Sequence, residues 1–156
     1  MPGKIKGELS GKGLRIGITI SRFNSEITEG LLRGALRALL ACQVSEKDIT
    51  AVEVPGAFEI PFALDRMAGS AKFDALIALG CVIKGETAHF EYIADSAMKG
   101  IATVQDKYRI PVACGVLTTY TEEQAIRRSS DNEENKGSEA ALTAIEMANL
   151  KRKLKG

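Results

Sequence analysis

One short apolar run near the middle of the chain restricts the fold more than any other feature. Residues 74–80 read DALIALG, and no side chain from Ala75 to Gly80 is polar. A continuous apolar run of this length is expected for a strand that is covered on both faces, as in a parallel sheet between two layers of helices. The run therefore predicts a buried strand in an α/β domain.

The rest of the chain alternates predicted strands and helices with short connections. Asn24 is a candidate N-cap for the first helix, and Pro61 is tolerated because it lies in the first turn of the second. This alternation predicts a flavodoxin-like three-layer α/β/α sandwich, with a mostly parallel four-stranded sheet and right-handed crossovers. Strands are expected at residues 14–20, 49–54, 74–80 and 111–117, and helices at 25–42, 57–70, 86–107, 121–128 and 138–150.

The length of 156 residues fits one domain, so we expect a single domain over residues 1–156. Residues 1–13 are too polar to belong to the core. We expect them to form either an edge strand or an N-terminal arm that lies on a neighbouring subunit.

Charge and hydropathy argue against nucleic-acid and membrane partners. The net charge is only +1, without the basic excess typical of nucleic-acid binders. The basic cluster KRKLKG, residues 151–156, is interpreted as cations that complete a helix C-terminus rather than as a polyanion patch. The longest strongly apolar stretch, residues 75–83, is less than half of what a bilayer requires, and the N-terminus has no apolar signal region. These features predict a protein without a membrane segment.

The cysteines indicate neither a disulfide framework nor a metal centre. There are three of them, Cys42, Cys81 and Cys114, and their spacing matches no CxxC or zinc motif. They are interpreted as reduced thiols, which predicts a cytoplasmic protein without a bound metal.

Several unusual segments follow the predicted strands directly. In an open parallel sheet, ligands bind beyond the carboxyl ends of the strands, so these segments are expected to converge on one site. They are residues 22–24, 55–59 and 80–89, together with Thr118 and Thr119.

Residues 80–87, GCVIKGET, have the glycine spacing of a P-loop but carry Glu86 where the phosphate-binding lysine would stand. A carboxylate at that position would repel a nucleotide polyphosphate. A glycine turn that leads into a helix N-terminus still favours one phosphate group, with help from the Thr87 hydroxyl. The alternative is a plain tight turn with a helix cap.

His89 is the only histidine of the chain and is expected in the first turn of a helix. A histidine that titrates near neutral pH can act as a general acid or base, although an isolated histidine is often structural. Phe23 and Phe58 follow strand ends, where each could stack on a planar heterocycle or simply anchor its loop. Of the adjacent Arg127 and Arg128, at most one is expected to face a site.

Five runs, in order and with compatible spacing, resemble the lumazine synthase family over residues 7–150. The resemblance implies condensation of 5-amino-6-(D-ribitylamino)uracil with 3,4-dihydroxy-2-butanone 4-phosphate, release of phosphate, and no metal or organic cofactor. The runs are GITISRFN (17–24), VPGAFEIP (54–61), DALIALGCVIKGETAHFEY (74–92), Thr118–Thr119, and NKGSEAALTAIEMANL (135–150).

The resemblance also implies roles for individual residues. Phe23 would stack on the pyrimidine, Glu59 would accept hydrogen bonds from the ribityl hydroxyls, and His89 would be the proton donor. The phosphate would be held by Glu86, Thr87 and Arg128, and Lys136 falls near the site. The remaining positions that would contact the ribityl-uracil are Ala57, Phe58, Cys81, Val82, Ile83 and Cys114.

Cys114 departs from the family pattern, which usually has a bulky apolar residue, often Phe, at this position. We expect a roomier pocket there and a greater dependence of stacking on Phe23. A nucleophilic role for Cys114 is not expected, because an amine and a ketone form a Schiff base without one.

Family members build pentamers, pairs of pentamers or sixty-subunit cages, so the resemblance implies self-association. The polar loop 129–135 carries no insertion, which favours the cage, and riboflavin synthase is a candidate partner. The site would then be shared, with Phe23, Glu59 and His89 from one subunit and Cys114, Arg128 and Lys136 from its neighbour. The competing interpretations are a flavin-binding module without turnover and a structural shell protein.

Overall fold

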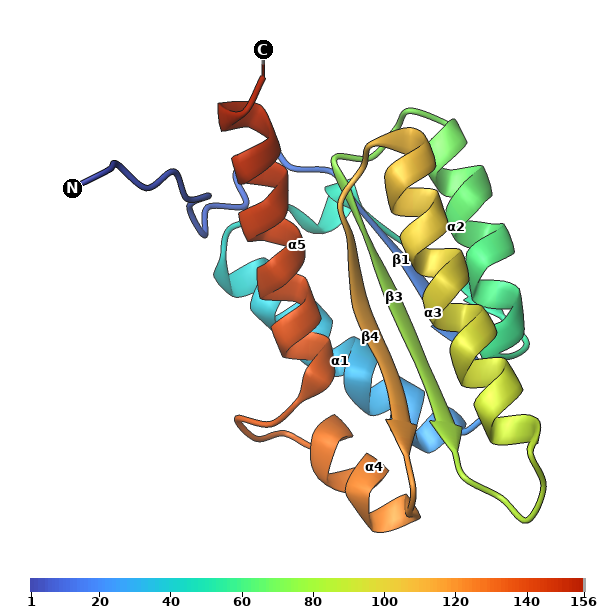
Figure 1. Cartoon of the computed structure of the whole chain (residues 1–156). Coiled ribbons are helices and arrows are strands. Elements are labelled where there is room, and N and C mark those ends of the chain that lie inside the picture. Colours follow the sequence, from blue (N-terminus) through green and yellow to red (C-terminus); the bar gives the residue numbers. More distant parts are fainter. Residues whose placement is uncertain (156) are drawn as a thin grey trace.

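The computed structural model describes residues 1–155, and its strands and helices alternate as the sequence predicts. The strands are β1 (Ile16–Ser21), β2 (Ile49–Val54), β3 (Ala75–Ile83) and β4 (Val112–Thr119). They form one sheet in the order β2-β1-β3-β4, and every neighbouring pair is parallel. Figure 1 labels β1, β3 and β4 of this sheet.

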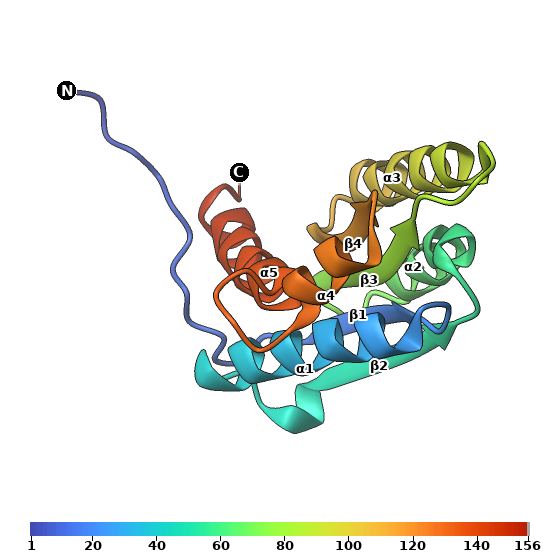
Figure 2. The ribbon, with the colours of Figure 1, turned by 90° about the horizontal axis from the view of Figure 1, so that it is seen from below.

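Helices cover both faces of this sheet, as Figure 2 shows from the end of the strands. On one face lie α1 (Ser25–Ala41), α4 (Glu122–Ser129) and α5 (Lys136–Lys153), and on the other α2 (Ile60–Gly69) and α3 (His89–Tyr108). Short 3₁₀ turns, η1 (Glu46–Asp48) and η2 (Ala57–Glu59), precede β2 and α2. The predicted flavodoxin-like three-layer sandwich is confirmed. Within residues 1–155, none of the helices combines the length and apolarity that a membrane span would need.

Strand β3 lies between β1 and β4 and contributes to two separate apolar cores. Ile77 and Leu79 pack toward α1 and α5, whereas Leu76 and Ala78 pack toward α2 and α3, and all four are fully buried. Burial of each Leu or Ile side chain contributes about 1.5–3 kcal/mol. The absence of polar residues from this run is therefore explained by helices on both of its faces.

Several boundaries differ from the sequence-based expectation, including those of β3, α3 and α5. β3 continues past Gly80 to Ile83, because β4 runs beside it up to the pair Ile83–Thr119. The helix predicted from residue 86 begins only at His89, and the last helix begins at Lys136, slightly earlier than expected. Partner strands and caps, which local sequence patterns do not encode, decide these ends.

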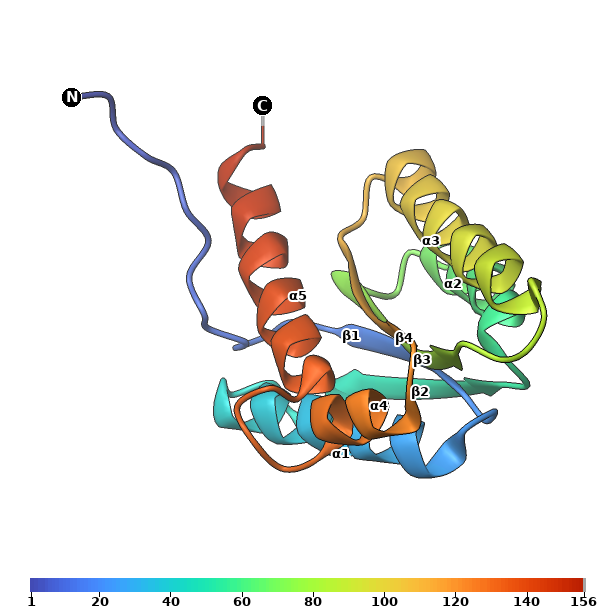
Figure 3. The ribbon, with the colours of Figure 1, turned by 60° about the horizontal axis from the view of Figure 1, so that its bottom comes forward.

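The first thirteen residues form no strand within the described chain. Their inner part lies along α5, where Lys153 donates hydrogen bonds to the Lys6 carbonyl oxygen at 2.6 Å and to the Glu8 carboxylate at 2.5 Å. Asn149 donates to the carbonyl oxygens of Glu8 and Ser10. The outer part extends away from the body of the molecule (Figure 3).

Helices α1 and α5 cross closely where α5 begins. A Cβ atom added to Gly137 would overlap the Leu31 carbonyl oxygen, so only glycine fits at this crossing. The buried Asn135 caps α5 by accepting a hydrogen bond from the Ser138 N–H at 3.0 Å, and it donates to the Gly30 carbonyl oxygen on α1 at 3.2 Å. The crossing thereby fixes the start of α5, and with it the position of Lys136.

We expect Gly137→Ala to lower the free energy of unfolding by about 1–3 kcal/mol, because the added methyl group overpacks the crossing. Helix propensity alone predicts the opposite sign, since alanine is favoured over glycine in helices by about 1 kcal/mol. Urea unfolding measures the change. Gly3→Ala is the control, because a Cβ atom added at Gly3 would meet no other atom within 4 Å. Equal stability of the two variants would contradict the close crossing.

Candidate functional site

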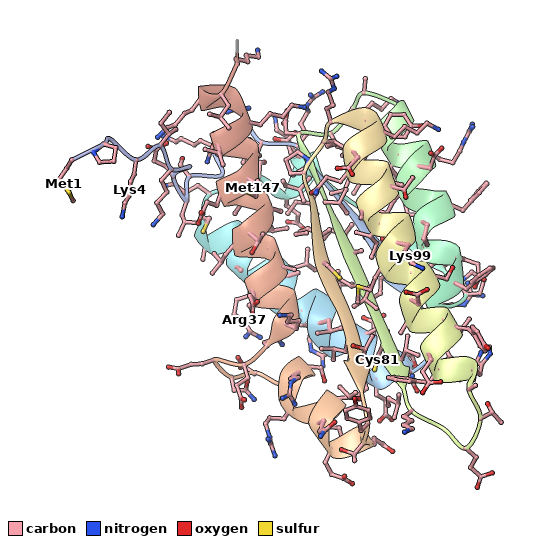
Figure 4. The ribbon with its side chains drawn as sticks, viewed as in Figure 1. Met1, Lys4, Arg37, Cys81, Lys99 and Met147 are labelled. Carbon is pink, nitrogen blue, oxygen red and sulfur yellow. The ribbon has the colours of Figure 1, made fainter. Side chains whose placement is uncertain are left out.

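A cavity of about 520 Å³ opens beyond the carboxyl ends of the strands, between η2 and the beginning of α3. Figure 4 labels Cys81 near the carboxyl end of β3, which forms part of its wall. The cavity is lined by Phe23, Pro55, Gly56, Ala57, Phe58, Glu59, Cys81, Val82, Ile83, Gly85, Thr87, His89, Phe90 and Ile93.

The loop after β1 is tied to the ends of both neighbouring strands. The Phe23 N–H donates to the Pro55 carbonyl oxygen at 3.0 Å, and the Asn24 side-chain amide donates to the Cys81 carbonyl oxygen at 3.1 Å. Asn24 precedes α1 as predicted but does not cap it with its side chain; its backbone is left-handed (φ 61°), and its amide reaches β3 instead. These contacts hold Phe23 at the mouth of the cavity, where 71% of its surface is exposed.

The wall formed by β3 extends past the last residue that pairs with β1. β1 pairs with β3 only up to Leu79, whereas β3 continues to Ile83 beside β4. Backbone groups of residues 81–83 that point toward β1 therefore lie beyond the last strand pair. Such groups can donate to and accept from the polar edge of a planar ring.

The Cys81 thiol lies in the apolar core rather than in the cavity. Its side chain packs in the core with α1 and α5, with 2% of its surface exposed. Burial raises the pKa of this thiol to about 12, so that it stays protonated at neutral pH. A protonated, buried thiol is a poor nucleophile, and the contribution of Cys81 to the cavity is its backbone.

The turn that leads into α3 offers an anion site at the far side of the cavity. Ala88 occupies the N-cap position of α3 without a side-chain cap, and the His89 N–H points at the Thr87 hydroxyl at 3.4 Å. The first N–H groups of a helix and its dipole favour a negatively charged group. Because Gly80 lies inside β3, the P-loop-like glycine spacing forms no loop, and the turn is made around Gly85.

Most of the predicted site residues come together in this cavity, but four do not line it. Glu86 lies in the exposed turn before α3, and Cys114 is half-buried on β4 with its sulfur 3.5 Å from that of Met98 on α3. Arg128, half-buried on α4, donates to the Gln124 carbonyl oxygen at 3.1 Å. Lys136 forms an ion pair with Glu139 at 2.8 Å.

Phe90 and Ile93 line the cavity, although the sequence analysis assigned neither of them to a site. They lie in the first turns of α3, where the apolar face of the helix projects beyond the end of the sheet. The Phe90 ring lies 6.2 Å from that of Tyr120, which follows β4. Their position next to His89 is the only signal in the sequence that could have assigned them to the site.

Residues 13–152 match the model of the family described as 6,7-dimethyl-8-ribityllumazine synthase. The chain belongs to this family. It is therefore a transferase of riboflavin biosynthesis that acts on small molecules, condensing 5-amino-6-(D-ribitylamino)uracil with 3,4-dihydroxy-2-butanone 4-phosphate. The match covers the cavity and all of the helices and strands almost to the end of α5.

Across residues 1–155, no three His, Cys, Asp or Glu side chains come together in a way that could hold a metal ion. The cavity beyond the strands is lined mainly by apolar residues, together with the side chains of Glu59, Thr87 and His89.

We expect iodoacetamide to alkylate the half-buried Cys42 and Cys114 of native protein at pH 8 before it reaches Cys81. At that pH the Cys81 thiol, with a pKa raised to about 12, is protonated as well as inaccessible. Peptide mass spectrometry of samples taken over time measures the order. Rapid labelling of Cys81 would show that its thiolate, rather than its backbone, faces the cavity.

Proposed function

We propose that the cavity binds the ribityl-uracil between Phe23 and the backbone of β3. The exposed Phe23 ring would stack on the pyrimidine, while backbone groups of Cys81, Val82 and Ile83 pair with its polar edge. Ala57, Phe58 and Glu59 of η2 would line the ribityl chain, with the Glu59 carboxylate accepting hydrogen bonds from its hydroxyls. The observation that carries this proposal is the extension of β3 past β1, which leaves backbone groups for a planar ligand.

The butanone phosphate would bind at the turn before α3. Backbone N–H groups near Glu86 and Thr87, the Thr87 hydroxyl and the helix dipole would hold its phosphate. His89, at the first position of α3, would transfer protons during Schiff-base formation and phosphate release. The uracil supplies the amine and the phosphate is the leaving group, so binding the two substrates together accounts for most of the catalysis.

Three of the four residues outside the cavity, Cys114, Arg128 and Lys136, support a site completed by a second subunit. The cavity is open on the side of Phe23 and Phe58, both of them exposed aromatic residues. A head-to-tail ring would bring Cys114, Arg128 and Lys136 of one subunit to the cavity of the next and would repeat one composite site at every junction. We propose a pentameric ring, with a sixty-subunit cage as its larger assembly.

We expect Arg128→Ala to raise the KM for the butanone phosphate by about 10–100-fold, the effect of losing one charge-assisted contact. The KM for the ribityl-uracil should change little, because that substrate carries no phosphate. Arg128→Lys should recover part of the loss. Steady-state kinetics with each substrate varied in turn measures both constants, and Arg127→Ala is the matched control on the exposed side of α4. Equal increases in the two KM values would refute the phosphate contact.

A mixing experiment tests whether the site is shared. One parent carries Phe23→Ala and His89→Ala, the other carries Arg128→Ala, and the two are unfolded and refolded as an equal mixture. Random assembly makes about a quarter of the junctions fully wild type. At a butanone phosphate concentration well below the raised KM of Arg128→Ala, where that parent is nearly inactive, we therefore expect about a quarter of the wild-type activity.

Native mass spectrometry establishes that mixed rings have formed, and each parent refolded alone supplies the baseline. If mixed rings form and the activity stays at that baseline, each site lies within one subunit.

A further inference from the structure

A second cavity, of about 370 Å³, lies at the opposite end of the sheet from the lumazine synthase site. Here the strands begin and α2, α3 and α5 end, at the top of Figure 1. The cavity is lined by Arg15, Ala68, Ala71, Phe73, Asp74, Tyr108, Ile110, Ala148, Lys151, Arg152 and Lys155. Its volume falls within the range of small-molecule sites.

The side chains around this cavity carry a surplus of positive charge. Lys151, Arg152 and Lys155 line it from the end of α5 and form no ion pair with any residue from 1 to 155. Lys153, on the same turn, is instead paired with Glu8 of the N-terminal arm. The cations of the C-terminal cluster are thus divided, and most of them face the cavity.

Asp74 is the only carboxylate among the residues from 1 to 155 that line the cavity, and it is already compensated. Arg15 donates to it from its backbone N–H at 2.7 Å and from its guanidinium at 3.3 Å. Burial alone would raise the pKa of Asp74. The hydrogen bonds and charge of Arg15, together with the charge of Arg152, outweigh that effect, so the pKa lies below its usual value. The Asp74 charge at neutral pH is matched mainly by Arg15, with a smaller contribution from Arg152, so most of the positive charge on α5 is not offset by Asp74.

Stabilisation of helix C-termini accounts for only part of this charge. Three helices end near the cavity, and each C-terminus carries up to about half of a negative charge. Together they offset roughly half of the three α5 cations. Positive charge therefore remains at the rim after the helix ends have been compensated.

The inner wall of the cavity is apolar and partly aromatic. Phe73 and Tyr108 are half-buried there, beside the buried Ala68, Ile110 and Ala148. An inorganic ion would leave this wall in contact with water, whereas a planar ring would cover it. A cationic rim beside an aromatic wall fits a ligand with a ring at one end and an anionic group at the other.

We propose that this cavity is a second ligand site, specific for a small planar organic anion of the heterocyclic phosphate monoester class. The ring lies against Phe73 and Tyr108, and the phosphate is bound by Lys151 and Arg152, with Lys155 at the rim. The inference is independent of the proposed roles in the first cavity, because the two cavities share no residue.

Isothermal titration with adenosine 5′-monophosphate, adenosine and inorganic phosphate at low salt tests the proposal. We expect saturable binding of the monophosphate. Adenosine and phosphate should bind more weakly, because adenosine has the ring without the phosphate and inorganic phosphate has no ring. Lys151→Gln combined with Arg152→Gln should raise the Kd for the monophosphate by about tenfold or more. Lys99→Gln combined with Lys153→Gln removes equal charge outside the cavity and should have no effect; Figure 4 labels Lys99 on α3.

Three results would overturn the proposal. The first is the absence of saturable binding, and the second is an equal loss of affinity for the monophosphate in both double variants. The third is a loss of affinity in Phe23→Ala without a loss in Lys151→Gln/Arg152→Gln. The last result would assign the binding to the first cavity. If the double variant folds poorly, amide chemical shifts of the wild-type protein decide instead. Shifts at Phe73 and Tyr108 support the second cavity, and shifts confined to Phe23 and His89 refute it.

Discussion

The structure depends on one strand that is buried on both faces. β3 supplies alternate side chains to two apolar cores, so the helices on either side of the sheet pack against the same backbone. Because β3 lies between β1 and β4, it also fixes the register of the sheet. Its last residues continue beyond β1 and form part of the wall of the cavity at the carboxyl ends of the strands.

The two ends of the sheet have opposite electrostatic character. At the carboxyl end of the strands, α3 begins with uncapped N–H groups, which suit the phosphate of one substrate. At the amino end three helices terminate, and cations from α5 gather there in excess of what the helix ends require. The parallel arrangement of strands and helices produces this polarity, since every βα unit points in the same direction.

Under the proposed function, one chain builds only part of the site. Phe23 and Phe58 are exposed beside the cavity, and burial of such rings in an assembly would contribute to its stability. The proposed ring uses the same surfaces for catalysis and for association. Under that proposal, loss of assembly and loss of activity are coupled, so the mixing experiment tests both.

The sequence by itself determined the layers of the fold and most of the cavity. Apolar periodicity predicted the strands and helices, and the rule that ligands bind beyond the carboxyl ends of parallel strands brought Phe23, Glu59 and His89 to one place. These features could be predicted because they depend on local patterns and on the direction of the chain.

Tertiary structure alone decided the details that depend on partners distant in sequence. β4 pairs with β3 as far as Ile83, whereas β1 pairs with β3 only as far as Leu79. The Asn24 amide reaches Cys81 rather than capping its own helix. Lys151 and Arg152 meet Phe73 and Tyr108 around a cavity that local patterns do not encode. Such contacts are set by the packing of whole elements, whose relative positions follow from the two cores rather than from neighbouring residues.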